Sequence, residues 1–273
     1  MHAGLYLPNQ GPFADPRRLA GLAAEAEAAG WEGFFFWDEM LPIFDPGHDV
    51  ADALIGLSAV AMATERLRIG AMVSPVSRLR PETFAHQTAT LDRLSGGRLI
   101  VGVGLGNPSD QFSAFGHPAD IKERAAMVDE FLDLLTRLWS GSTVDFHGTY
   151  YTAAGVKMTA PLQSPRIPIW IGADTRNRAP RRRAARWDGF IPASHHWPDE
   201  VIPLEDYEAA IADIRALRPA TDPFDVIVIG DRTGTQPTAD ALKSYEAAGV
   251  TWLLVQALTP EDAEERIRRG PPF

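Results

Sequence analysis

Residues 67–106 read LRIGAMVSPVSRLRPETFAHQTATLDRLSGGRLIVGVGLG and hold the clearest strand–helix–strand pattern of the chain. The helix is expected to begin at Pro81, and the second strand carries glycine at every second position. Side chains alternate between the faces of a strand, so Gly102, Gly104 and Gly106 share one face. A glycine gives a strand nothing to pack, and this face therefore offers bare backbone to a neighbouring side chain or a bound ring.

The same unit, a short apolar strand followed by a polar loop and an amphipathic helix, recurs along the chain. Strands are expected at residues 4–7, 33–37, 67–73, 99–105, 167–171, 189–192, 224–229 and 250–255. Helices are expected at residues 16–29, 51–63, 81–95, 121–139, 180–186, 205–217, 237–248 and 260–269. Alternating strands and helices predict a parallel sheet with right-handed crossovers. At 273 residues, and with no break in composition, the pattern predicts one α/β domain over residues 1–273, closed as a (β/α)8 TIM barrel.

Composition excludes several classes of function. A formal net charge of -10 disfavours a nucleic-acid partner, because such binding depends on Lys and Arg that neutralise phosphates. The chain has no cysteine, and therefore no disulfide, thiolate chemistry or cysteine-ligated metal. It has no apolar run of about 18 residues for a membrane span and no secretory leader pattern at its start, so a cytoplasmic protein is expected. Neither HxH in the first strand nor HExxH is present, which disfavours a metal hydrolase.

Barrel topology indicates which loops are candidates for the active site, because active sites of such barrels lie at the carboxyl ends of the strands. The residues found there are Asn9, Gln10, Asp38, Glu39, Ser74, Asn107, residues 174–178, His195, His196, residues 231–235 and Gln256. Residues 143–151 predict a hairpin that turns at His147–Gly148. This hairpin lies between a helix and the next strand, so His147 is expected at the opposite end, in a structural role; His86, within a helix, is also expected to be structural.

The pattern RLRIGxxVxP, RP and ATLDRLSGGRLxxGVGLG in residues 66–106 resembles the bacterial luciferase-like monooxygenase family. Further matches are LPNxGPxADP at 7–16, WD at 37–38, IPIWIGA at 167–173, DGFxP at 188–192 and RIRxGPP at 266–272. The resemblance implies a flavin- or deazaflavin-dependent oxidoreductase. One form is a monooxygenase that uses reduced FMN and oxygen on a small organic substrate; the alternative exchanges a hydride between coenzyme F-420 and the substrate. The chain is short for the family and lacks a long insertion near the seventh strand, which implies a reduced substrate lid.

The resemblance also implies where the cofactor ring lies. The ring is expected over the barrel mouth, close to Gly104 and Gly106, with Asn107 at the rim. From the residues alone, the glycines equally fit packing against bulky side chains of the next barrel layer. Family members often hold a non-proline cis peptide at the end of the third strand, and Ala71–Met72 is the nearest match here.

Residues 172–176 lead from the fifth strand into a helix start, whose free N–H groups and dipole favour an anion. The phosphate-binding candidates in this segment are Gly172, Ala173, Asp174, Thr175 and Arg176. Arg176 is the expected phosphate contact. The arginines that follow are interpreted mainly as a solvated helix face; they are Arg178, Arg181, Arg182 and Arg183. The rival phosphate site is the segment 230–235 after the seventh strand.

The sequence offers several candidates for the catalytic acid or base. Many relatives carry Asp-His after the second strand, whereas this chain has Asp38-Glu39. Glu39 can replace the histidine if burial raises its pKa toward neutrality. Asp38 fits equally a role in binding backbone at the strand end. His195 and His196 are the other candidates, although a His-His pair in a loop is more often a surface feature.

Two functions from other classes stay open. One is a flavin-binding protein without catalytic activity, and the other is a barrel lyase or isomerase that acts on a phosphorylated substrate bound at 230–235. A dinucleotide site is disfavoured, because GVGLGNP lacks the third glycine and no helix follows it directly. The resemblance also implies a homodimer through the second and third helices, and the Ala-rich residues 51–63 permit such a contact.

Overall fold

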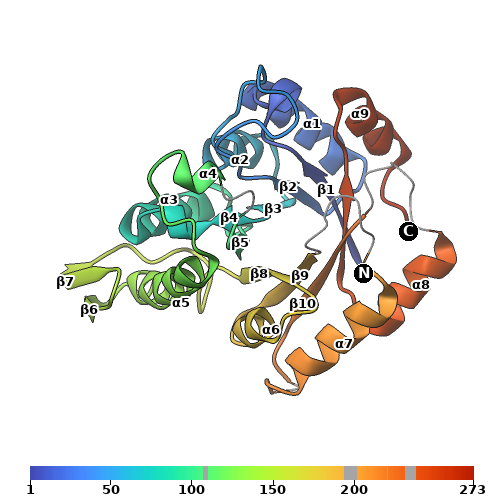
Figure 1. Ribbon diagram of the computed structural model, residues 1–273. Helices are drawn as coiled ribbons and strands as arrows, with labels where there is room; N and C mark the ends of the chain where they lie inside the picture. The colour runs from blue at the N-terminus through green and yellow to red at the C-terminus, as the bar shows by residue number, and fades with distance from the viewer. Residues whose placement is uncertain (107–109, 194–201, 220, 231–237) are drawn as a thin grey trace.

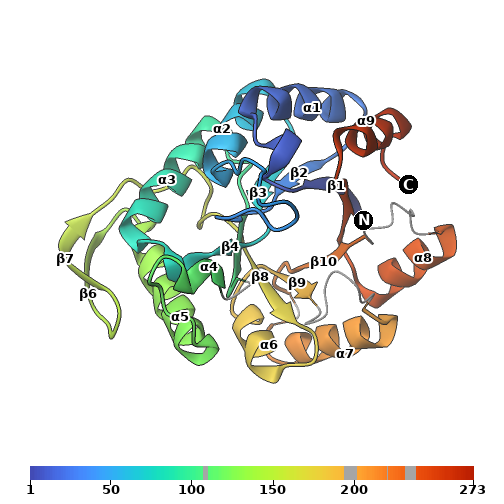
Figure 2. The ribbon, with the colours of Figure 1, turned by 45° about the horizontal axis from the view of Figure 1, so that its top comes forward.

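The computed structural model describes residues 1–106, 110–193, 202–219, 221–230 and 238–273, and it shows a parallel barrel surrounded by helices (Figures 1 and 2). The strands of the large sheet are β1 (His2–Leu7), β2 (Gly33–Phe36), β3 (Arg68–Ala71), β4 (Ser74–Pro75), β5 (Val101–Gly104), β8 (Ile169–Asp174), β9 (Gly189–Ala193), β10 (Asp225–Ile229) and β11 (Trp252–Gln256). The helices are α1 (Pro16–Ala28), α2 (Ala53–Ala63), α3 (Pro81–Leu94), α4 (Asp110–Ser113), α5 (Ile121–Leu138), α6 (Arg178–Ala184), α7 (Leu204–Arg215), α8 (Ala239–Ala248) and α9 (Pro260–Arg269).

Strand pairing closes the barrel. The sheet runs in the order β3-β2-β1-β11-β10-β9-β8-β5-β4. Its β3 side meets β5 through a parallel bridge between Ile69 and Leu99, and the Ile100 N–H donates to the Ile69 carbonyl over 2.8 Å. The (β/α)8 fold predicted from the sequence is therefore confirmed. Each expected strand has a counterpart, with ends that differ from the prediction by a few residues.

Local signals account for the helix starts. The Asp15 carboxylate accepts a hydrogen bond from the Arg17 N–H at the start of α1, where Pro16 is the first helical residue. Thr259 caps α9 by accepting from the Asp262 N–H. The stripe expected to be buried on α1 is buried in the structure and consists of Leu19, Leu22, Ala23 and Ala26. Helices such as α1 pack their buried faces on the outer side of the barrel (Figure 2).

Aromatic rings fill the lower interior of the barrel. The Phe35, Trp170 and Trp252 rings lie with centroids 5.6–5.7 Å apart. Gly33 and Gly189 make room for them, because a Cβ on either would approach Phe35 or Trp170 to 2.4 and 2.3 Å. This filled end is a packed core rather than a channel, and it confines any site to the other end.

The most distinctive sequence block, ATLDRLSGGR, is structural. The Arg98 guanidinium donates to the carbonyls of Ala61, Thr64 and Leu67, where α2 ends and β3 approaches. The Asp92 carboxylate is fully buried and accepts from the backbone N–H groups of 162 and 163 over 2.7 and 2.9 Å. The block thus fixes connections at the amino ends of the strands.

A two-stranded hairpin projects from the barrel beside α5 (Figures 1 and 2). It pairs β6 (Thr143–His147) with β7 (Thr152–Lys157), so the turn spans 148–151 rather than His147–Gly148. The physical reason is the Glu130 carboxylate of α5, which accepts from the backbone N–H groups of residues 149, 150 and 151. His147 is exposed on this hairpin. In the described part of the chain no helix is both long and apolar enough to cross a bilayer.

Candidate active site

The glycine face of β5 is covered by other residues of the same protein. A Cβ on Gly102 would lie 2.3 Å from the Ala71 carbonyl oxygen, and one on Gly104 would lie 2.4 Å from Val73 Cγ2. Gly172 on β8 receives the same valine from the other side, with Val73 Cγ1 at 2.8 Å from a Cβ there. The packing alternative is therefore what the geometry shows at these glycines. Because these glycines have no side chains, Met72 and Val73, the residues between β3 and β4, fill the space beside them.

The position that a side chain on Gly106 would take is also filled by neighbouring residues. Its φ of +77° is the left-handed conformation that favours glycine, and a Cβ there would lie 2.7 Å from both Phe112 and Pro75. Asn107, expected at the rim beside Gly106, lies outside the described residues.

The cis peptide lies at Met72–Val73 and not at Ala71–Met72 as the sequence reading expected. The backbone keeps the hydrogen-bond pattern of the sheet as far as Met72, because the Met72 N–H donates to the Phe36 carbonyl over 2.7 Å. Ala71 is thus an ordinary buried strand residue, and the chain leaves the sheet only after Met72 before it pairs with β5 again at Ser74. The Tyr6 hydroxyl donates to the Met72 carbonyl and holds this segment from inside the barrel.

Glu39 lies at the carboxyl end of β2 in a tight polar network. Gln111 of α4 donates its Nε2 hydrogen to the Glu39 carboxylate over 2.6 Å and accepts the Met40 N–H over 3.0 Å. Asn9 holds the Glu39 backbone on both sides, donating to its carbonyl over 2.9 Å and accepting from its N–H over 3.2 Å. The backbone of Glu39 is therefore held from the loop after β1, and its carboxylate is held from α4.

The surroundings of Glu39 shift its ionisation. Burial raises the pKa of Glu39 to about 7, while the hydrogen bond from Gln111 and the charge of Arg78 act in the opposite direction. Burial, together with the charge of Glu39, also raises the pKa of the Tyr6 hydroxyl, which stays neutral. A carboxyl group with a pKa near neutrality takes up and releases protons at working pH.

Asp38 has a different environment from Glu39. The Arg78 guanidinium donates to the Asp38 carbonyl and, over 3.0 Å, to its carboxylate. Burial raises the pKa of Asp38, and the Arg78 charge and the Ser74 side chain oppose that shift. The Asp38 carboxylate is therefore paired with the Arg78 guanidinium.

The segment after β8 combines buried and exposed groups. Asp174 and Thr175 are buried, and the Thr175 N–H donates to the Ala193 carbonyl over 3.2 Å. The Asp174 carboxylate accepts the Arg176 N–H over 2.7 Å and lies 3.6 Å from Arg176 Nε. Arg176 is exposed, and the backbone of Ala173 pairs with Pro192.

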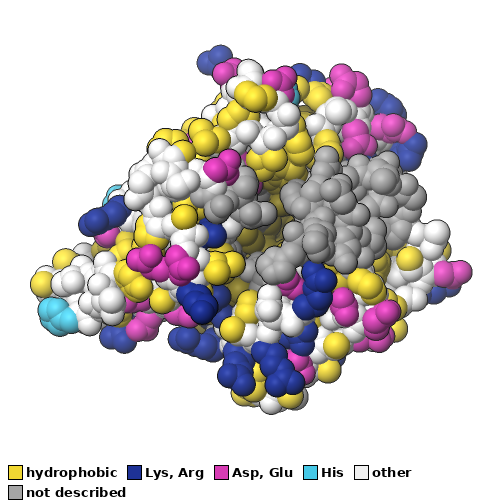
Figure 3. All heavy atoms as spheres, viewed as in Figure 1, with side chains coloured by type: hydrophobic (Ala, Val, Ile, Leu, Met, Phe, Trp, Pro, Cys, Tyr) yellow, Lys and Arg dark blue, Asp and Glu magenta, His cyan; other side chains and the backbone are white. Residues whose placement is uncertain are grey.

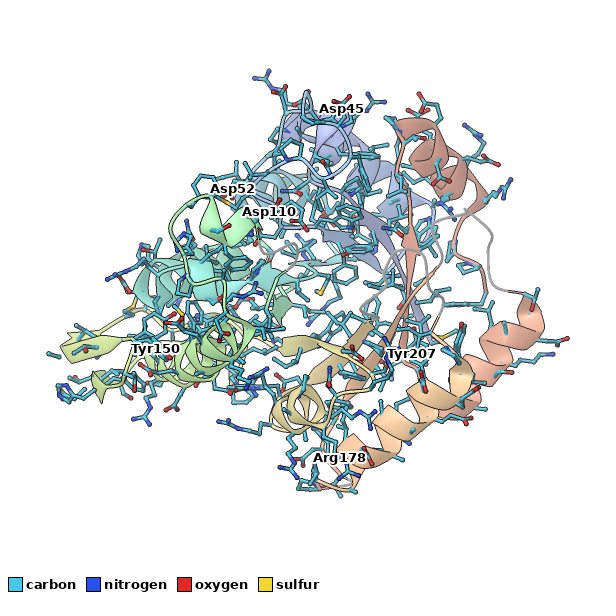
Figure 4. The ribbon with its side chains drawn as sticks, in the orientation of Figure 1. Asp45, Asp52, Asp110, Tyr150, Arg178 and Tyr207 are labelled. Carbon is cyan, nitrogen blue, oxygen red and sulfur yellow. The ribbon has the colours of Figure 1, made fainter. Side chains whose placement is uncertain are left out.

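The arginine-rich helix α6 is only partly a solvated face. Arg178 and Arg182 are exposed, and Figure 4 shows Arg178 at the outer edge of the molecule. In contrast, Arg181 pairs with Asp213 of α7, and Arg183 pairs with Asp129 of α5 over 2.6 Å. The two inner arginines therefore tie neighbouring helices together, which corrects the expectation for them.

Apolar side chains surround the polar network. The Trp37 and Phe44 rings lie with centroids 5.5 Å apart, and Met40 and Ile43 of the same loop are 46% and 37% exposed. Hydrophobic side chains also gather near the centre of the face shown in Figure 3. The loop after β2 thus offers an apolar wall beside Glu39.

Some predicted residues are not placed, and some residues of the network were not predicted. His195, His196 and residues 231–235 lie outside the described residues. Gln111, Arg78 and Tyr6 were missed by sequence reasoning. Strand alternation was the one signal for Tyr6, since it follows Gly4 on the interior face. Gln111 lies on the four-residue helix α4 and Arg78 on a three-residue 3-10 helix, and neither element is long enough to show a period. Within the described ranges, no cluster of three or more His, Asp or Glu side chains is arranged to hold a metal ion.

Comparisons with known proteins agree with this architecture. A model of the luciferase-like monooxygenase family matches residues 1–265. A curated relative from Amycolatopsis mediterranei, named F420-dependent glucose-6-phosphate dehydrogenase, is 34% identical over 160 residues, covering 58% of this chain and 48% of the relative. The enzyme of the same name from Rhodococcus erythropolis is 29% identical over 288 residues, covering 93% of this chain and 84% of the relative. The chain thus spans about half the length of the first of these relatives.

A solved structure shares the fold at lower sequence similarity. It is described as an F420-dependent secondary alcohol dehydrogenase in complex with an F420-acetone adduct. It superposes with a TM-score of 0.80 at 15% identity, covering 99% of this chain and 98% of that one. At this identity the likeness concerns the fold alone.

Proposed function

Because the chain belongs to the luciferase-like monooxygenase family, we propose that it is an oxidoreductase that exchanges a hydride between coenzyme F-420 and a small organic substrate. The choice of F-420 over FMN is supported by the curated relatives, which are named F420-dependent dehydrogenases. The observation that carries the proposal is the carboxyl group of Glu39, whose pKa burial raises to about 7 at the carboxyl end of β2.

The residues at the barrel mouth fit a flat ring system. Val73 fills the space over Gly104 and Gly172, so the surface that supports the ring is made by Met72 and Val73 rather than by bare glycine backbone. The phosphate end of the coenzyme is assigned to residues 172–176, where Arg176 is exposed and oriented by Asp174. When bound, the deazaflavin accepts or donates the hydride, and the protein supplies placement and proton transfer.

Glu39 is the proposed general base for oxidation of an alcohol. As the carbon loses its hydride, the ionised Glu39 carboxylate takes the hydroxyl proton, and the product is a carbonyl compound. In the reverse direction the protonated Glu39 returns that proton to the oxygen. A pKa near 7 keeps both forms available, as general acid–base catalysis requires.

Reduced FMN with oxygen stays the second candidate, because the matched family is described as luciferase-like monooxygenases. Titration of the purified protein separates the two. Coenzyme F-420 is expected to bind with a micromolar or lower Kd, measured by its fluorescence, while FMN and reduced FMN bind at least about tenfold more weakly. Tighter binding of reduced FMN, with substrate-dependent oxygen uptake, would reverse the assignment. If no cofactor binds at micromolar concentration, the proposed function is wrong.

The homodimer predicted from the family remains a proposal with one structural support. Helix α2 presents apolar side chains to solvent, with Ile55 and Met62 at 62% and 71% exposure. We assign this face to the contact between two copies, because exposed apolar surface on a helix gains stability when it is covered. The double variant Ile55→Glu/Met62→Glu is expected to sediment as a monomer where the wild type sediments as a dimer. A monomeric wild type would refute the assignment.

A further inference from the structure

Gln256 ends β11 on the face that points into the barrel. Leu254 and Trp252, two and four residues earlier, belong to the barrel-interior cluster, whereas Leu253 and Val255 pack toward the helices. Alternation along the strand therefore places the Gln256 side chain in the interior at the carboxyl end. Its register partner on the next strand is Tyr6.

The amide of Gln256 is buried, and no described residue pairs with it. The residue is 2% exposed, and neither Oε1 nor Nε2 makes a hydrogen bond to any of the described residues. Other amides keep at least one partner: Asn9 makes three hydrogen bonds, Gln163 donates to Asp92 and Leu99, and Gln10 accepts the Ile43 N–H although its Nε2 is unpaired among the described residues. Because nearly all buried polar groups are satisfied, an amide with both ends unpaired indicates a place for an atom from outside the chain.

The strand order shows what Gln256 faces. In the closed sheet β11 lies beside β1 and four positions from β5, so Gln256 lies across the barrel from the wall formed by Met72 and Val73. Tyr6 stands between the two walls, with its hydroxyl donating to the Met72 carbonyl and its pKa raised in part by Glu39. Gln256, Tyr6 and Glu39 thus come from three adjacent strands and line the same side of the mouth.

We propose that Gln256 is a substrate-binding residue that hydrogen-bonds the oxygen of a small alcohol or carbonyl compound. The Nε2–H donates to the hydroxyl or carbonyl oxygen, and Oε1 accepts the proton of a hydroxyl group. The carbon part of the substrate contacts the apolar wall at Trp37 and Phe44. This inference rests on the proposed function, since a cofactor ring on Met72 and Val73 leaves the Gln256 side of the mouth to the substrate.

A first experiment uses the ligand-free protein and needs no knowledge of the substrate. Gln256→Leu removes an amide that has no partner, so its thermal midpoint is expected at or above that of the wild type. Gln163→Leu is the matched control, and its midpoint is expected several degrees lower, because it leaves Asp92 and Arg68 without their amide partner. If the thermal midpoint of Gln256→Leu falls as far as that of the control, the amide has a structural partner and the inference is wrong.

A second experiment uses the protein loaded with F-420 and a panel of secondary alcohols. Gln256→Leu is expected to raise KM about tenfold or more while the Kd for F-420 stays unchanged. A weaker Kd for F-420 with an unchanged KM would assign the amide to the coenzyme and refute the inference, yet leave the proposed function intact. The same refutation follows if the wild type turns over no alcohol of the panel. If the wild type binds no F-420, the proposed function fails, whereas the melting comparison still tests whether the amide awaits a ligand.

Discussion

Gln111 donates its amide hydrogen to the Glu39 carboxylate across 2.6 Å and so links the start of α4 to the end of β2. The bond favours the ionised form of Glu39, because only the carboxylate offers both oxygens as acceptors. Residues that are 72 positions apart therefore set one ionisation together.

Removal of this bond is expected to shift the pH dependence of the reaction. In Gln111→Leu the pKa of Glu39 rises above about 7, because burial is no longer opposed by the amide. The limb of the kcat/KM profile that reports the base then moves to higher pH. Profiles of wild type and variant with the same alcohol measure the shift, and an unchanged limb would show that Glu39 is not the titrating base.

Loss of the carboxyl group is expected to remove turnover without removing the cofactor. Glu39→Gln keeps the size of the side chain but cannot accept a proton, so kcat is expected to fall by about 10²–10⁴-fold. The Kd for F-420 should stay within about twofold, because the assigned ring support is Met72 and Val73. Steady-state rates and fluorescence titration check both parts; an active Glu39→Gln enzyme would exclude Glu39 as the base.

Glu39 also makes the stability depend on pH. Its pKa is raised from 4.5 to about 7 on folding, so the folded state holds the proton more tightly than the unfolded state. The contribution of Glu39 to the free energy of unfolding is fully present below pH 4.5 and is lost as pH rises through about 7. The shift corresponds to at most about 3 kcal/mol. Denaturant unfolding at several pH values should show a smaller decline for Glu39→Gln than for the wild type, and equal declines would contradict the raised pKa.

The packing of Val73 against the glycine strand is tested by Gly104→Ala. The added Cβ would lie 2.4 Å from Val73 Cγ2, so the variant is expected to lose about 1–3 kcal/mol of stability. Gly21→Ala in α1 is the matched control: it meets nothing within 4 Å and should gain about 0.5–1 kcal/mol as a better helix former. The double variant Gly104→Ala/Val73→Ala should recover part of the loss. A neutral Gly104→Ala would mean that the valine does not fill this space.

The barrel was predictable because its signals are local. Strand alternation, the stripe on α1 and the caps at Asp15 and Thr259 each depend on residues close in sequence, and all of them are present in the structure. The helix turn α4 and the small strand β4 were not predicted, because each is held by contacts with distant segments.

Only some residues of the site could be predicted from the sequence. Glu39 was a candidate from its place after a strand, and the structure adds the burial that raises its pKa. The occupant of the glycine face was undetermined, because strand alternation shows that Gly104 is bare but not which distant residue fills the space. That residue is Val73, placed there by the pairing of β4 with β5. Gln111 on the short helix α4 and Arg78 on a 3-10 helix are distant in sequence from the site, and only the folded chain brings them to Glu39 and Asp38.

The contact of Val73 with two glycines on neighbouring strands divides the barrel mouth into a constrained half and an adaptable half. Any enlargement at residues 73, 104 or 172 must be matched by a reduction at one of the others, so this side can change only through coordinated substitutions. Gln256 has no such partner among the described residues, and Met40 and Ile43 are exposed. Single substitutions at exposed positions such as Met40 and Ile43 are open to selection or engineering for new substrates, while the side held by Val73 keeps the same shape.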